Sequence, residues 1–157
     1  MKYLKLLISI AIPLLAGFIG SLFTTPSIKS GWYETLTRPA LTPPSWVFPI
    51  AWTILFILMG IALYLVWKRP INTKRHLAHL AYLLFAAQLI LNVWWSVLFF
   101  YLQKPSWALM EIVVLWLFVL FTTLTFKKID RRAGWLLVPY LLWVIFAAYL
   151  NYNIALG

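Results

Sequence analysis

Five long stretches with almost no charged residues constrain this chain more than any other feature of its sequence. The stretch between Lys5 and Lys29 holds 23 uncharged residues, and the stretch between His79 and Lys104 holds 24. A helix needs about 20 apolar residues to cross a bilayer, and lipid offers no hydrogen-bond partners to any other backbone conformation. The sequence therefore predicts an all-α membrane protein with a five-transmembrane-helix bundle, whose spans lie near residues 5–25, 45–67, 78–101, 106–126 and 134–154 of a single domain, 1–157.

The composition excludes a soluble domain. Hydrophobic residues make up 64% of the chain and charged residues only 10%, against roughly 45–50% and about 25% in soluble domains. The net charge of +10 is often a sign of nucleic-acid binding. Here the basic residues fall between apolar runs, which favours contact with lipid headgroups and indicates no nucleic-acid partner.

The placement of the basic residues predicts an orientation. Ten of the 13 Lys and Arg fall at the N-terminus and in the connections 68–76 and 127–132, whereas Lys29, Arg38 and Lys104 fall on the other side. Basic residues are enriched in cytoplasmic loops, so we expect a cytoplasmic N-terminus, with the C-terminus and the 26–44 connection on the opposite side. The first apolar stretch resembles a signal peptide but lacks a good cleavage site, so we interpret it as a retained span.

Few residues are available for conventional catalysis or for metal binding. The chain has no Cys and only three acidic residues, which excludes thiolate sites and leaves no carboxylate pair for hydrolysis. His76 and His79 have no carboxylate near them in sequence, so no metal site is expected. Glu111 lies within a span and is either a proton or cation site or a side chain favoured by the helix dipole in the second turn of its helix.

Polar, small and aromatic residues recur at helical spacing within the spans. In the third span, Gln88, Asn92, Trp95 and Phe99 lie on one stripe, which predicts either a polar and aromatic cavity wall or hydrogen bonding between helices. Polar residues within spans normally face protein rather than lipid. Similar stripes, which ordinary helix packing would also explain, are Gly17, Ser21 and Thr24 in the first span, Trp52, Phe56 and Gly60 in the second, and Pro139, Trp143, Ala147 and Leu150 in the fifth.

The connection between the first two spans is the most distinctive segment. Residues 26–46 are rich in Pro and Trp, and the connection is long for one that joins two helices. A connection of this length over the end of a bundle is a candidate lid. Lys29 and Arg38 are the residues in it that could contact anionic groups of a ligand.

Short motifs along the whole chain resemble the TspO/MBR family, whose members are also called translocator proteins, peripheral-type benzodiazepine receptors or tryptophan-rich sensory proteins. Each motif is short, but their order is specific. The motifs are Trp32-Tyr33, Arg38-Pro39, Pro43-Pro44, Trp46, Trp52-Thr53, Met59-Gly60, Gln88-Leu89, Leu91-Asn92, Trp95, Phe99-Phe100, Trp107-Ala108, Glu111, Pro139-Tyr140, Trp143, Phe146-Ala147 and Leu150-Asn151.

The resemblance implies a five-helix bundle, often a homodimer, with a cavity beneath the first connection. That cavity binds porphyrins such as protoporphyrin IX, as a ligand rather than a cofactor, and synthetic isoquinoline carboxamides. Some bacterial members are proposed to degrade protoporphyrin in light through tryptophans that match Trp52 and Trp143. Carried over by position, the ligand-binding residues are Ser21, Tyr33, Phe48, Trp52, Phe56, Asn92, Trp95, Trp107, Trp143, Ala147 and Leu150.

Two departures from the family pattern stand out, and the second favours a bacterial member in a bacterial cell membrane. The family usually has Trp between Pro39 and Pro43, where this chain has Leu41, a change expected to weaken a contact of the connection with the ligand or the lid. Animal members end with a cholesterol motif in which a basic residue follows Tyr, whereas no basic residue follows Tyr149 or Tyr152 here. Sterol recognition by this motif, which is weak even when intact, is therefore not expected.

We expect a membrane receptor or sensor that binds porphyrins and related flat hydrophobic molecules in a cavity within the bundle. The alternatives are a light-dependent porphyrin-degrading activity or a transporter of tetrapyrroles or sterols. The sequence argues against transport because it contains no broken helix pair and no inverted repeat. It leaves open whether the protein is an enzyme.

Overall fold

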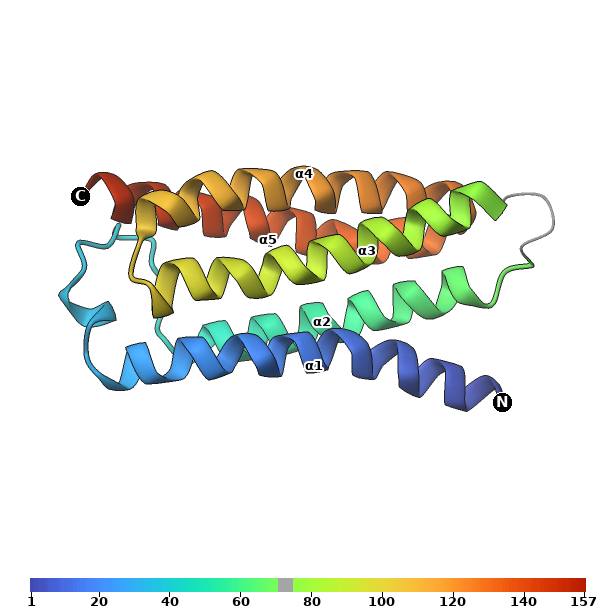
Figure 1. Ribbon diagram of the computed structural model, residues 1–157, viewed down its shortest axis with the longest axis horizontal. Coiled ribbons are helices and arrows are strands. Elements are labelled where there is room, and N and C mark those ends of the chain that lie inside the picture. Colours follow the sequence, from blue (N-terminus) through green and yellow to red (C-terminus); the bar gives the residue numbers. More distant parts are fainter. Residues whose placement is uncertain (71–74) are drawn as a thin grey trace.

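The chain forms five long helices in a computed structural model that describes residues 1–70 and 75–157 (Figure 1). Each is long and apolar enough to cross a membrane, the third together with a π-helical turn that continues it. This confirms the predicted fold class. Lys74, one of the ten basic residues counted above, lies outside the described residues. The elements are α1 (Lys2–Lys29), the 3-10 turn η1 (Tyr33–Thr35), α2 (Val47–Trp67), α3 (Arg75–Ser96), the π-helical turn η2 (Val97–Tyr101), α4 (Pro105–Ile129) and α5 (Arg131–Leu156).

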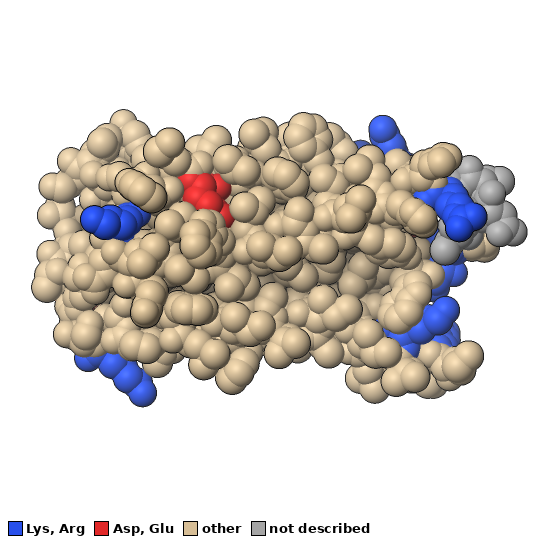
Figure 2. All heavy atoms as spheres, in the orientation of Figure 1, with Lys and Arg blue, Asp and Glu red and all other residues tan. Residues whose placement is uncertain are grey.

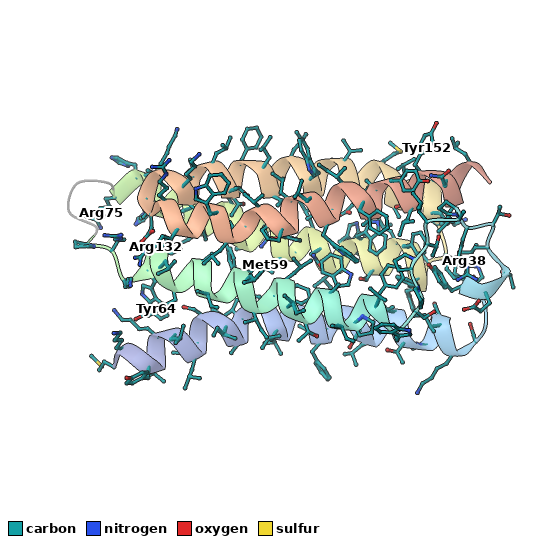
Figure 3. All side chains as sticks on the ribbon, turned by 180° about the vertical axis from the view of Figure 1, so that it is seen from behind. Arg38, Met59, Tyr64, Arg75, Arg132 and Tyr152 are labelled. Carbon is teal, nitrogen blue, oxygen red and sulfur yellow. The ribbon has the colours of Figure 1, made fainter. Side chains whose placement is uncertain are left out.

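The helices run the length of the molecule, and the two termini lie at opposite ends (Figure 1). Arg75 and Arg132 lie at the end that carries the N-terminus, and Arg38 and Tyr152 lie at the other (Figure 3). On the face shown in Figure 2, Lys and Arg atoms gather towards the two ends and are missing from the middle. This distribution suits a bundle whose middle lies in hydrocarbon. The cytoplasmic location of the N-terminus stays a prediction, which the accessibility of single introduced cysteines in intact cells would test.

Helix boundaries follow from local chemistry. Pro105 opens α4, at the position where its missing N–H costs nothing. Asp130 separates α4 from α5, and its side chain accepts a hydrogen bond from the backbone N–H of Arg132 at 2.9 Å, as an N-cap does. Helix α1 continues through Pro13 and Pro26 to Lys29, so it is longer than the predicted span. Prolines are tolerated in membrane helices because neighbouring groups satisfy the freed carbonyls.

The helices are tightly packed towards the end of the bundle that carries the N-terminus. Met59 is completely buried and lies near the middle of α2 (Figure 3), and Phe85 stacks on Phe126 with ring centroids 5.7 Å apart. A side chain at Gly60 would place its Cβ only 2.4 Å from the Cα of Ile10. Gly60 therefore sits at a close approach of α1 and α2, and small residues at such positions let two membrane helices touch.

One carboxylate joins three helices at this end. Arg69, just after α2, donates to Asp130 Oδ2 from Nη2 at 2.7 Å and from Nε at 3.0 Å. Arg132 contacts the same carboxylate at 3.2 Å, and the Asp130 side chain is only 1% exposed. Burial alone would raise the pKa of Asp130, but hydrogen bonds from Arg132 and Arg69 outweigh it and lower the pKa to about 2.

The lowered pKa of Asp130 predicts a stability difference that depends on pH. Because the folded pKa lies below the ordinary value of 3.8, the ionised carboxylate stabilises the fold above about pH 4, and the gain is lost as the pH falls towards 2. Asp130→Asn should lower the melting temperature in detergent at pH 7. The difference in melting temperature between the wild type and Asp130→Asn should become smaller as the pH falls below about 4. A difference that does not change with pH over this range would contradict the lowered pKa of Asp130.

Candidate functional site

A cavity of about 410 Å³ lies within the bundle near the α1–α2 connection. All five helices contribute to its wall, together with η2 and Tyr33 of η1. Apolar and aromatic side chains predominate, with few polar groups. Pockets for small molecules typically have about 300–1,000 Å³ and a lining of this kind. The cavity is therefore the candidate functional site.

Two tryptophans from different helices meet on the cavity wall. Trp52 of α2 and Trp143 of α5 both line it, and their ring centroids lie 6.4 Å apart in an edge-to-face arrangement. Phe56 stacks on Trp52 at 5.6 Å, and Phe48 meets Trp143 edge to face at 6.2 Å. The indole N–H of Trp143 is buried and has no hydrogen-bond partner in the described part of the chain. These rings present flat, rigid surfaces on which another ring system can stack.

The π-helical turn η2 shapes the opposite part of the wall. Phe99 and Phe100 in this turn line the cavity, and Trp95, one turn earlier, stacks on Phe99 with ring centroids 5.0 Å apart. Trp95 donates from Nε1 to Asn151 Oδ1 at 2.9 Å, and Asn151 donates to the Pro105 carbonyl at 2.8 Å. Such turns frequently occur at functional sites. Asn151 thus fixes the orientation of Trp95 and joins α3, α4 and α5 at this end.

The α1–α2 connection covers the end of the cavity. Trp32 packs edge to face on Phe99, and Tyr33 packs on Phe100 with ring centroids 6.0 Å apart. Arg38 lies over the Tyr33 ring at 4.9 Å and pairs with Glu34 at 2.8 Å. Burial raises the pKa of the Tyr33 hydroxyl, and Arg38 partly offsets the effect. We call Trp32 and Tyr33 the roof of the cavity.

A buried hydrogen-bond network begins at the cavity and leads into the core. Asn92, which lines the cavity, donates from Nδ2 to the Tyr140 hydroxyl at 2.9 Å. That hydroxyl donates to Gln88 Oε1 at 2.7 Å, and Gln88 Nε2 contacts the sulfur of Met59 at 3.8 Å. The network confirms hydrogen bonding between helices for Gln88 and Asn92. It also places Asn92 on a cavity wall, so both interpretations of the stripe apply.

Glu111 is the buried acid of α4. Its two oxygens have no hydrogen-bond partner in the ranges 1–70 and 75–157, although the side chain lies within electrostatic range of Tyr140. Glu111 does not belong to the cavity lining, and it is the seventh residue of α4. Both interpretations of Glu111, as a proton or cation site and as a side chain favoured by the helix dipole, are compatible with this position.

Ten of the eleven residues predicted to bind ligand line the cavity, and the exception is Trp107. Its side chain is 66% exposed. On α4 the buried stripe runs through Ala108, Ile112 and Leu115, and one residue's step turns Trp107 about 100° away from it. Lys29 and Arg38 also lie outside the lining. The ten lining residues are Ser21, Tyr33, Phe48, Trp52, Phe56, Asn92, Trp95, Trp143, Ala147 and Leu150.

Several lining residues were not predicted. Gly20 and Thr25 of α1 belong to the wall, as do Ile112 and Leu115 of α4 and Asn151 of α5. The spacing of Gly17, Ser21 and Thr24 indicated the correct face of α1, but small residues also fit ordinary packing. Ile112 and Leu115 carry no such signal, because apolar residues occupy every face of a membrane helix.

The chain is similar to known proteins over nearly its whole length. The sequence model of the TspO/MBR family matches residues 9–156. A tryptophan-rich protein TspO from Chlorobaculum tepidum is 46% identical over 153 residues, which cover 98% of this chain and 95% of that protein. One from Archaeoglobus fulgidus is 42% identical over 157 residues, covering 99% and 98%. The translocator protein of Bos taurus is 33% identical over 142 residues, covering 90% and 83%.

The network around Tyr140 predicts a stability effect. Tyr140→Phe removes the hydroxyl that accepts from Asn92 and donates to Gln88, and it leaves two buried amides short of a partner. The expected loss is on the order of 1–3 kcal/mol, measured by thermal unfolding in detergent. Tyr149→Phe is the matched control, because Tyr149 is an exposed residue of the same helix. Equal melting temperatures for Tyr140→Phe and the wild type would contradict the network.

Proposed function

The chain belongs to the TspO/MBR family, and from this premise we propose that it is a membrane receptor for porphyrins and similar flat hydrophobic molecules. The ligand lies in the cavity and stacks on the rings of Trp52 and Trp143. The protein takes part in tetrapyrrole handling through this binding. The observation that carries the proposal is the pair of tryptophans on one cavity wall, with ring centroids 6.4 Å apart.

The chemistry of the wall supports a flat, largely apolar ligand. Aromatic side chains contribute from α2, η2 and α5, and aromatic pairs are worth about 0.5–1.5 kcal/mol each beyond the area they bury. The unpartnered indole N–H of Trp143 and the amide of Asn92 are the polar groups near these rings. In such a pocket, a small number of polar groups fixes the orientation of the ligand, while the apolar wall supplies most of the affinity. A ring system with a few hydrogen-bonding atoms meets these requirements.

The carboxylates of a porphyrin would lie at the roof rather than deep in the cavity. Arg38 pairs with Glu34 and lies over Tyr33, and only Tyr33 of these three lines the cavity. A ligand carboxylate would therefore replace Glu34 as the partner of Arg38. An exposed ion pair of this kind is worth about 0–1 kcal/mol, so the exchange is not costly.

Binding of protoporphyrin IX tests the proposal through quenching of tryptophan fluorescence in detergent. The double variant Trp52→Ala, Trp143→Ala should weaken binding by about tenfold or more, because each lost ring removes about 1 kcal/mol of stacking. The matched control is Trp94→Ala, Trp107→Ala, which removes two exposed tryptophans outside the lining. Unchanged affinity in the first variant, or an equal loss in the control, would contradict the proposed site.

A second candidate function is light-dependent degradation of the bound porphyrin. The observation that favours it is the position of Trp52, which contacts Trp143 at 6.4 Å and Tyr140 at 6.2 Å. An oxidisable indole beside an excited porphyrin ring can give up an electron to it, and the reduced ring can pass that electron to dioxygen, which is the oxidant that the degradation requires. The intensity of the porphyrin's Soret band should then fall under light with the wild type, and more slowly with Trp143→Phe. Equal decay with Trp143→Phe and with a Trp94→Phe control would rule this activity out.

A further inference from the structure

Among the residues that the structure describes, the exposed part of the cavity lining follows the line where α1 faces the start of α2. Every exposed residue of its lining comes from α1 or from the segment 45–53. The lining residues from α3, η2, α4 and α5 are all buried or half-buried. A residue that both lines a cavity and is exposed to the outside marks an opening. We call this opening the mouth; it consists of Phe18, Ser21, Thr25 and Ile28 on α1, Ser45 just before α2, and Pro49 and Thr53 on α2.

The end of the cavity is closed by contrast. Trp32 and Tyr33 of the roof pack on Phe99 and Phe100. Ser27, buried near the end of α1, donates its hydroxyl hydrogen to the Phe100 carbonyl. The roof is therefore attached to η2 by ring packing, and α1 is attached to η2 by a hydrogen bond. No comparable contact holds the mouth residues of α1 to those of α2 within the described residues.

The mouth lies at the depth of the hydrocarbon. Thr25 and Phe18 precede Lys29, the exposed basic residue at the end of α1, by about 6 Å and about 16 Å along the helix at about 1.5 Å per residue. Half of a hydrocarbon core is about 15 Å thick. The mouth thus faces the acyl chains of the leaflet on the side of the α1–α2 connection.

The surface of the mouth suits lipid. Phe18 is 60% exposed and Ile28 is 40% exposed. The hydroxyls of Ser21 and Thr53 donate to carbonyls of their own helices, Phe18 and Pro49, at 2.6 and 2.7 Å. Because these two donors are satisfied within their own helices, they need no partner from the bilayer.

We propose that ligand enters and leaves the cavity sideways, from the leaflet next to the α1–α2 connection, through the mouth between α1 and α2. The proposal rests on the proposed function, since it concerns the ligand of the same cavity. It defines the ligand class more narrowly, as molecules dissolved in the bilayer rather than in water. It also predicts that the roof stays closed while ligand exchanges.

The chain contains no Cys, so single cysteines test the route directly. Thr53→Cys places a thiol at the mouth, Ile54→Cys places one on the exposed neighbouring position outside the lining, and Ala40→Cys places one on the α1–α2 connection. Each variant is reconstituted in liposomes, with and without a bulky maleimide. Protoporphyrin IX is delivered from preloaded vesicles, and its association and dissociation are followed by tryptophan quenching. Thr25→Cys, at another exposed mouth residue that is not among the predicted ligand-binding residues, replaces Thr53→Cys if the latter does not fold.

The label at Thr53→Cys should slow association and dissociation together, by about tenfold or more, because it obstructs the route that both steps use. Labels at Ile54→Cys and Ala40→Cys should have no effect. Slowing by the label at Ala40→Cys alone would overturn the proposal in favour of entry through the roof. Weaker affinity without slower association at Thr53→Cys would overturn it too. Absence of binding by the unlabelled wild type would instead contradict the proposed function itself.

Discussion

Polar groups inside a bilayer must find their partners inside the protein, and the rest of this structure depends on that constraint. Asn92, Tyr140 and Gln88 satisfy one another across α3 and α5, and Trp95 reaches the Pro105 carbonyl through Asn151. These bonds hold three helices in register around the cavity. The two amides of the wall, Asn92 and Asn151, are held in place by these bonds.

The two ends of the bundle differ because their side chains differ. Towards the N-terminal end, Gly60 lets α1 and α2 touch, and the Asp130 carboxylate holds Arg69 and Arg132. Towards the other end, large rings on α2 and α5 meet edge to face. The cavity lies at this end, where these rings and Gly17 and Gly20 of α1 share its wall, and the α1–α2 connection covers its end. A small ligand can therefore bind without any rearrangement of the closed end.

The sequence was sufficient for the fold and for part of the wall. Run length alone predicts five helices, and the stripes through Trp52, Asn92 and Trp143 predict three parts of the lining. Trp107 shows the limit of carrying residues over by position, because a one-residue step on α4 turns it outward. The π-helical form of η2 and the pairing of Arg38 with Glu34 depend on three-dimensional packing. No periodicity in the sequence reports them, and none reports an opening between two helices.

A structure of the protein with protoporphyrin IX bound would test the central claim most directly. The account predicts the porphyrin ring inside the cavity, against Trp52 and Trp143, with its carboxylates towards Tyr33 and Arg38. Porphyrin on the outer surface of the bundle, with the cavity unchanged, would contradict it.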